Sequence, residues 1–332
     1  MNTPYYSGII TNYVCTAACR HCMFGSSPDC PKTFITPAAA ENLASILEEA
    51  KTASVHIGGG EPFVNFPALC SLIDALNRHG IGVDYIETNA FWAKEDDLVR
   101  ERLWELTKRG VTTVMVSADP FHIEYVPIGR VLRLIRLLGE EGFDYFVWQE
   151  RYLRRLMRLE HDRTYTRGEL EKILGKTYIE DTAREYGLGM NGRALAIASR
   201  LYGKQPADAL CDSRPCRKIL EPHHCHFDLD GNAVPSGCPG LTAEARDYLC
   251  GTIRADRYPV MSRLLEGGTA ALYAYAREHG FIPDEKGYPT KCAFCYAMRT
   301  YLVKHKPSAD LSPACFYENI DKSLAEAETE LI

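Results

Sequence analysis

The sequence predicts an α/β fold: a partial (β/α)6 barrel of the TIM type, followed by a smaller cysteine-rich α+β extension. Two observations predict this architecture. Short apolar or β-branched runs alternate with amphipathic helical patterns over the first two hundred residues, which is typical of parallel strands joined by right-handed crossovers. This alternation stops after Lys204, and eight of the thirteen cysteines follow. We therefore expect the barrel in residues 1–204 and the extension in residues 205–332.

The elements expected in the barrel are five clear strands, a weaker sixth one and the helices between them. The first helix has proline at an allowed first-turn position and Leu43, Ile46 and Leu47 on one face. Six units would leave the barrel open, unlike the closed eight-fold form. The expected strands are Ser7–Thr11, Ser54–Ile57, Gly82–Glu87, Val111–Ser117, Phe143–Trp148 and the weaker Leu188–Asn191, and the helices are Pro37–Lys51, Pro67–His79, Glu95–Arg109 and Glu124–Gly142.

The charged segment 150–186 has a helical pattern and delays the sixth strand. We interpret it as an insertion near the mouth of the barrel. In related α/β architectures, ligands sit at the carboxyl ends of the strands. Site residues are therefore expected where each strand ends.

Composition and charge exclude several classes of protein. A net charge of −6 and a pI near 6.0 give no basic footprint for nucleic acid or for an anionic membrane. The chain has neither a secretory signal nor an apolar run of transmembrane length, so we expect a cytoplasmic protein. Thiols stay reduced in the cytoplasm, so the many cysteines indicate metal-binding or catalytic roles and not disulfide bonds.

Three cysteines lie together in the loop after the first strand: Cys15, Cys19 and Cys22. Three thiolates in a short loop can each reach a different iron of a cubane cluster, leaving the fourth iron without a protein ligand. Soft thiolates also suit zinc. Structural zinc sites are usually built from CxxC pairs, however, and this triplet fits them poorly even with His21 available as a fourth ligand.

The spacing Cys-x3-Cys-x2-Cys after a first strand resembles the signature of the radical S-adenosylmethionine (SAM) superfamily. The resemblance implies a [4Fe–4S] cluster whose open iron chelates the methionine part of SAM. It also implies an external electron donor such as flavodoxin or ferredoxin. The enzyme would cleave SAM reductively to methionine and a 5′-deoxyadenosyl radical, which abstracts a hydrogen atom from an unactivated carbon.

A second motif, Gly58-Gly59-Gly60-Glu61-Pro62, follows the second strand and resembles the GGEP motif of the same family. The resemblance implies that it binds the SAM amino group. Glycines let backbone carbonyls approach an ammonium closely, and the glutamate adds a negative charge. By the same resemblance, further SAM contacts are expected at the ends of the third, fourth and sixth strands, at Asn89, Ser117, Asp119 and Asn191.

In the extension, a hairpin predicted over residues 226–234 is followed by Cys238 and by the pair Cys292 and Cys295. This arrangement resembles the SPASM and Twitch extensions of radical SAM enzymes. It implies one auxiliary [4Fe–4S] cluster, as in the shorter Twitch form. Zinc is the alternative metal for the same cysteines.

The remaining ligand of that cluster is open between Cys211, Cys216 and Cys225. Cys225 is in phase with Phe227 on one strand face, as a buried core thiol would be. Cys216 lies in a proline-containing loop and is the preferred ligand. The other cysteines are expected to be ordinary packed or surface residues: Cys30, Cys70, Cys250 and Cys315.

Polar residues at the strand ends are the candidates for contact with a second substrate. His56, Asp119 and Gln149 are the candidate catalytic residues, and the other expected contacts are Glu87, His122, Glu150 and a histidine-rich loop at 223, 224 and 226.

The substrate itself, a small molecule or a peptide, is not identified by any residue. The barrel pattern starts at the N-terminus, which disfavours a leader-dependent peptide maturase and a cobalamin-dependent methyltransferase. Two alternatives stay open: a peptide-modifying maturase of the SPASM type and a non-enzymatic zinc-binding regulatory protein.

Overall fold

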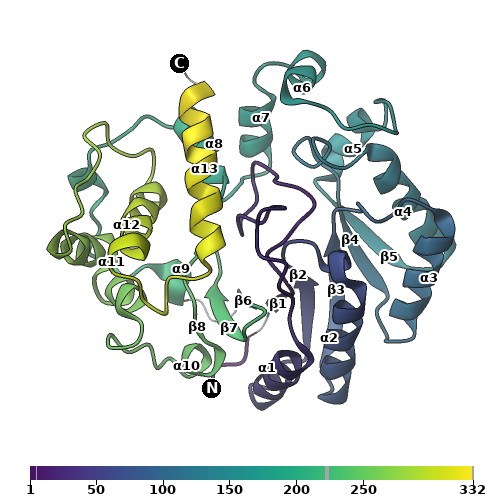
Figure 1. Cartoon of the computed structure of the whole chain (residues 1–332), viewed down its shortest axis with the longest axis horizontal. Coiled ribbons are helices and arrows are strands. Elements are labelled where there is room, and N and C mark those ends of the chain that lie inside the picture. Colours follow the sequence, from purple (N-terminus) through teal and green to yellow (C-terminus); the bar gives the residue numbers. More distant parts are fainter. Residues whose placement is uncertain (5, 221–223, 331–332) are drawn as a thin grey trace.

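The computed structural model describes residues 1–4, 6–220 and 224–330, and in these ranges one eight-stranded sheet forms the centre of the molecule (Figure 1). Its strand order is β5-β4-β3-β2-β1-β6-β7-β8. The pairs from β5 to β6 are parallel, and β7 and β8 are antiparallel to their neighbours. The predicted α/β fold class is confirmed. The strands are β1 (Tyr6–Ile10), β2 (Ser54–Gly58), β3 (Gly82–Thr88), β4 (Thr113–Ser117), β5 (Asp144–Trp148), β6 (His224–Phe227), β7 (Asn232–Pro235) and β8 (Ala243–Glu244).

The helices between the first five strands form where the apolar periodicity predicts them. In α1, Leu43, Ile46 and Leu47 are buried, and the Thr36 side chain caps the helix by accepting a hydrogen bond from the Ala39 N–H. Helices α1 and α2 pack together, as do α3 and α4. Their bounds are α1 (Pro37–Glu49), η1 (Pro62–Asn65), α2 (Phe66–Arg78), α3 (Asp96–Thr107) and α4 (Ile128–Glu140).

The predicted sixth strand at Leu188–Asn191 is wrong. This segment is irregular, because Gly187 and Gly192 have positive φ and the Asn191 N–H bonds to the Gly189 carbonyl in a tight turn. The sixth parallel position belongs to β6, which pairs with β1 on the side opposite β2. The sheet therefore continues across residue 204, the predicted domain boundary.

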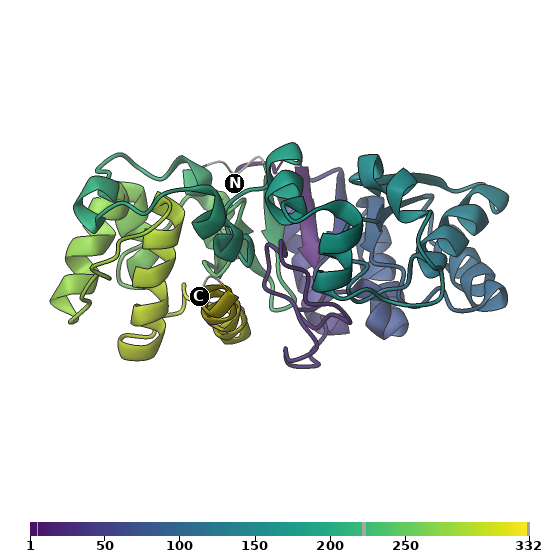
Figure 2. The same ribbon diagram turned by 90° about the horizontal axis from the view of Figure 1, so that it is seen from above.

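The segment 150–186 is helical, as the sequence predicts, and it leads through further helices to the extension. The extension lies on the side of the central strands opposite α3 and α4, and both views agree on this arrangement (Figures 1 and 2). No helix in the described ranges is long and apolar enough to cross a bilayer. The remaining elements are α5 (Glu150–Leu156), α6 (Arg167–Leu174), α7 (Tyr178–Glu185), α8 (Ala194–Leu201), η2 (Ala207–Leu210), α9 (Arg217–Leu220), α10 (Ala245–Cys250), α11 (Pro259–Glu278), α12 (Lys291–His305) and α13 (Ala314–Glu330).

Candidate active site

The three cysteines of the predicted triplet lie in the loop that follows β1. Cys15 and Cys19 are buried, Cys22 is half-buried, and all three are free thiols. The Cys22 N–H donates to the Cys19 carbonyl at 3.0 Å, which closes a tight turn between these two residues. Burial raises the pKa of the Cys15 thiol, and the nearby Glu61 carboxylate raises it further. Three soft sulfur donors in one short loop fit a cubane iron–sulfur cluster that keeps one open iron.

Arg193 anchors this cysteine loop from a distant part of the chain. Its side chain is 4% exposed; Nε donates to the Cys19 carbonyl at 2.8 Å, and Nη2 donates to the Ser26 carbonyl. Its backbone N–H donates to the Cys22 carbonyl at 3.0 Å. The sequence singles out the neighbouring Asn191 but assigns no role to Arg193. Only the structure shows that this arginine fixes the loop.

The glycine-rich turn after β2 packs directly on the cysteine loop. The Gly60 N–H donates to the Asn12 carbonyl at 2.7 Å, and the Glu61 N–H donates to the Val14 carbonyl at 3.1 Å. A Cβ on Gly60 would lie 2.1 Å from the Val14 oxygen, and Gly59 has φ +129°. Glycine is therefore required at both positions. In the described part of the chain, the half-exposed carbonyls of Gly59 and Gly60 accept no hydrogen bond, so both can accept one from a ligand.

The Glu61 carboxylate is buried and joins the same turn to the end of β3. It accepts hydrogen bonds from the Phe63 N–H (3.1 Å), the Thr88 hydroxyl (2.9 Å) and the Asn89 N–H (2.8 Å). Burial raises the pKa of Glu61 to about 7, although these hydrogen bonds oppose the shift. The Asn89 side-chain amide in turn donates to Cys15 Sγ at 3.5 Å. Both predicted SAM contacts, Glu61 and Asn89, therefore lie against the cysteine loop, and Pro62 is the buried first residue of η1.

The residues predicted at the ends of β4 and β5 differ in their surroundings. The Asp119 carboxylate is 1% exposed, and its Oδ2 lies 2.7 Å from His122 Nδ1 and 3.6 Å from His21 Nε2. Burial raises the pKa of Asp119, but these histidines outweigh it and lower the pKa to about 2. Ser117 ends β4, and Gln149 follows β5 with φ +70°. His21, the residue available as a fourth zinc ligand in the sequence, therefore has the Asp119 carboxylate as a neighbour.

Four cysteines predicted as auxiliary-cluster ligands line one cavity in the extension. Cys216 precedes α9, Cys238 follows β7, and Cys292 and Cys295 lie in the first two turns of α12. The neighbouring Cys238 thiol lowers the pKa of Cys216. The structure thus brings together cysteines that are up to 79 residues apart in the chain, and neither Cys211 nor Cys225 lines this cavity.

A buried arginine, Arg299, lies beside these four cysteines. It is 7% exposed, and its Nη1 donates to the Pro239 carbonyl at 3.0 Å. No acceptor for its Nε is found among the described residues. A buried cation with an unused donor fits a negatively charged neighbour, such as a metal group held by four thiolates.

The other residues singled out in the sequence lie as follows. The Asn191 amide donates to the Gly237 carbonyl at 3.0 Å and lines the four-cysteine cavity. Cys225 is fully buried in β6, and burial raises its pKa to about 12. Cys30, predicted to be an ordinary packed residue, lies beside Cys315 of α13, which lowers the pKa of Cys30, and the sequence does not reveal this proximity.

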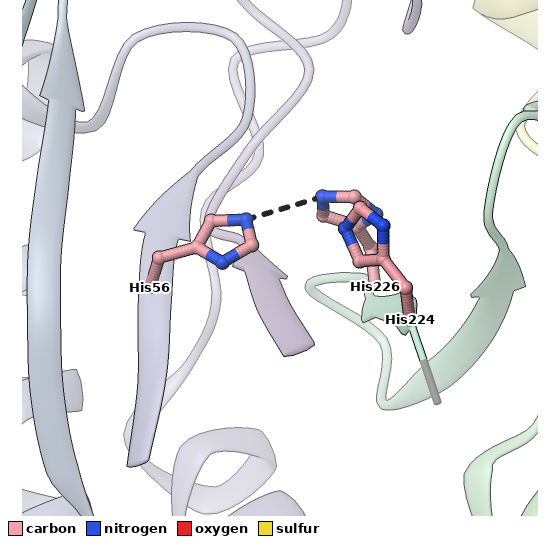
Figure 3. A group of neighbouring side chains, drawn as sticks. All are labelled: His56, His224 and His226. Carbon is pink, nitrogen blue, oxygen red and sulfur yellow. Dashed lines mark hydrogen bonds between the residues drawn. The ribbon is translucent and has the colours of Figure 1, made fainter. Parts of the chain in front are cut away.

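His56 lies in the middle of β2 and not at its end, and it is 3% exposed. It meets His224 and His226 of β6 (Figure 3). His223 lies outside the described residues. Burial lowers the pKa of His56 to about 4 and also lowers the pKa of His226. Both rings are therefore neutral near pH 7.

Comparison with solved structures found weak overall likenesses. BtrN in complex with AdoMet and 2-DOIA is 16% identical, with 80% of this chain and 88% of that chain covered and a TM-score of 0.42. Streptococcus suis SuiB bound to S-adenosylmethionine is 15% identical, with 85% and 77% covered and a TM-score of 0.46. Native anSMEcpe with bound AdoMet is 13% identical, with 98% and 97% covered and a TM-score of 0.43.

Comparison with curated proteins found no match. A family model described as the radical SAM superfamily matches residues 9–154. The match covers the end of β1, the strands from β2 to β5, the cysteine loop and the glycine-rich turn. The chain therefore contains a radical SAM domain over residues 9–154, which indicates a radical SAM enzyme, and a C-terminal extension follows this domain.

Proposed function

We propose that this enzyme holds a [4Fe–4S] cluster on Cys15, Cys19 and Cys22 and binds SAM beside it, in order to abstract a hydrogen atom from a small-molecule or peptide substrate. One observation carries the proposal. The glycine-rich turn and Asn89, from two different strand ends, converge on the loop with the three thiols. Such convergence of three separate segments is what a shared cofactor site requires.

When bound, the cluster supplies the electron that cleaves the C–S bond of SAM, giving methionine and a 5′-deoxyadenosyl radical, with flavodoxin or ferredoxin as the external donor. The chain's own residues bind and orient the reactants. The carbonyls of Gly59 and Gly60 can accept hydrogen bonds from the SAM ammonium. Asn89 donates a hydrogen bond to Cys15 Sγ, and Ser117, at the carboxyl end of the neighbouring strand β4, would bind a ribose hydroxyl. The buried strand ends exclude water from the reacting atoms.

We assign roles to three of the predicted site residues from their contacts and their places in the sheet. Asp119 already binds His122, so we assign it a positioning role and not a direct SAM contact. Asn191 belongs to the four-cysteine cavity. Gln149, at the end of the edge strand β5, stays the candidate for contact with the second substrate.

We further propose that Cys216, Cys238, Cys292 and Cys295 hold an auxiliary [4Fe–4S] cluster, and that residues 205–332 serve as its domain. The shared cavity and the buried Arg299 support a thiolate-bound metal group. Zinc at this site is the alternative metal.

Iron and sulfide analysis of anaerobically reconstituted protein tests the proposed clusters. Two cubane clusters correspond to about eight irons per chain. Replacing Cys15, Cys19 and Cys22 together by Ala should leave about half of the iron, and replacing Cys292 and Cys295 should remove the other half. Cys216→Ser should also lose the auxiliary iron, whereas Cys225→Ser, the matched control, should keep it. About four irons with one zinc would contradict the auxiliary cluster.

A further inference from the structure

A row of residues across three strands brings two histidines together on one face of the sheet. Gly8 of β1 is in register with His56 of β2 on one side and with His226 of β6 on the other. A Cβ on Gly8 would lie 2.2 Å from His56 Nε2 and 2.6 Å from His226 Cδ2. Because Gly8 has no side chain, the two imidazoles meet above the central strand.

A third histidine, His224, completes the group. One ring nitrogen of each histidine lies within 4.8 Å of those of the other two, and the rings point toward one another (Figure 3). Ser236 Oγ lies 3.2 Å from His224 Nδ1 and orients the ring. The buried Nε2 of His224 has no hydrogen-bond partner among the described residues, so it is free to bind a ligand.

The spacing of the nitrogen atoms matches a metal site. Zinc–imidazole bonds are about 2.0–2.1 Å long, so two nitrogens in a tetrahedral zinc site are about 3.3 Å apart. His56 Nε2 and His226 Nε2 are 3.3 Å apart. Glu87 Oε1, the carboxylate oxygen on the next strand, lies 3.8 Å from His56 Nε2 and is available as a fourth ligand.

We propose that His56, His224 and His226 form a divalent transition-metal site of the zinc class, with Glu87 as the fourth ligand. The donors are nitrogen and oxygen, which zinc accepts in tetrahedral sites. The site is separate from both cysteine groups and combines β2 and β3 of the family domain with β6 of the extension. Two of its ligands, His224 and His226, lie outside the residues that match the family model, so the site depends on the extension.

The test uses protein with its iron–sulfur clusters reconstituted, loaded with Zn²⁺ alone and freed of loosely bound metal by gel filtration. We expect one zinc per chain by mass spectrometry of the metals. X-ray absorption at the zinc edge should show nitrogen and oxygen neighbours at about 2.0 Å and no sulfur shell.

His226→Gln should abolish retention of this zinc, and Glu87→Gln should weaken Zn²⁺ binding at least tenfold. If the His226 variant misfolds, His224→Gln tests the same site by a change at a half-buried position. Circular dichroism checks the fold of each variant. The matched control, His161→Gln on an exposed loop, should retain one zinc. Zinc with sulfur neighbours, equal zinc in wild type and the His226 and His224 variants, or no zinc in the wild type would each overturn the proposal.

Discussion

At the scale of single residues, the structure changes the role expected for Glu61. The motif predicts that its charge faces the SAM ammonium, yet its carboxylate already accepts three hydrogen bonds inside the protein. It caps η1 and ties the glycine-rich turn to β3. Its first contribution is therefore to the stability of the site.

Glu61→Gln tests this role. The NH2 group of glutamine would face at least one of these N–H or O–H groups, and two donors cannot form a hydrogen bond with each other. We therefore expect the free energy of unfolding to fall by about 1–3 kcal/mol. Urea unfolding of the metal-free protein measures the change. Glu95→Gln is the control, because Glu95 is exposed and its side chain makes no capping bond. Equal stability of both variants and the wild type would show that the three hydrogen bonds contribute nothing.

Arg193 gives a second prediction at this scale. Each hydrogen bond from a charged donor contributes about 1.5–3 kcal/mol, and Arg193→Met removes two of them from the cysteine loop. We expect the variant to release iron from the first cluster to a chelator faster than the wild type. Arg184→Met, at a side chain that is 63% exposed, should release iron at the wild-type rate. Identical rates in all three proteins would mean that Arg193 does not hold the loop.

The cysteines and glycines of the site could be predicted because their spacing is a local property of the sequence. Cys15, Cys19 and Cys22 are separated by only a few residues, and the structure keeps them in one loop. Arg193 and the histidine group could not be predicted in the same way. Their contacts join residues about 170 positions apart and depend on which strands become neighbours.

At the scale of the elements, β1 is the strand that joins β2–β5 to β6–β8 in the sheet. It is parallel to both β2 and β6, and its Gly8 lets the side chains of these two neighbours meet. The first five strands could be predicted because each carries its own apolar run between turn residues. No local pattern of residues indicates that β6 pairs with β1. The sequence therefore predicts a sixth strand at Leu188–Asn191, where the structure has an irregular segment.

Gly8→Ala tests the packing around β1. The added methyl group would lie 2.2 Å from His56 Nε2, and overpacking of this kind costs about 1–3 kcal/mol. Gly82→Ala in β3 is the matched control, since its Cβ would make an ordinary 3.5 Å contact with Ser54, and we expect a change within about 0.5 kcal/mol. Thermal or urea unfolding compares the two. A neutral Gly8→Ala change would contradict the close approach of the histidines.

At the scale of the whole molecule, the extension is part of the fold that builds the first site. Strands β6 and β7 continue the barrel sheet, and α13 returns to the cysteine loop, where Asn319 Nδ2 donates to the Gly25 carbonyl at 2.9 Å and to Cys30 Sγ at 3.1 Å. The segment 191–193 touches both cysteine groups. Sequence patterns separate the chain into two parts, but the pairing of β6 with β1 and the contacts of α13 join them.

A chain that ends at residue 204 should therefore not fold into a soluble protein that holds the first cluster. It would lose the neighbour of β1 and expose that strand edge, which promotes aggregation. Solubility and iron content of the shortened chain measure this outcome. The Asn319→Ala variant of residues 1–332, which loses only the hydrogen bonds of this one side chain to Gly25 and Cys30, should stay soluble. A soluble shortened chain with about four irons would show that the barrel folds independently.

The central claim is that the cysteine loop and the glycine-rich turn form a site for reductive cleavage of SAM. The most direct measurement is 5′-deoxyadenosine formed by anaerobically reconstituted protein with SAM and a strong reductant. The account predicts formation by the wild type and none by the variant with Cys15, Cys19 and Cys22 replaced by Ala, because no thiolate would remain in that loop to hold the cluster. Full retention of 5′-deoxyadenosine formation in this variant would contradict the account.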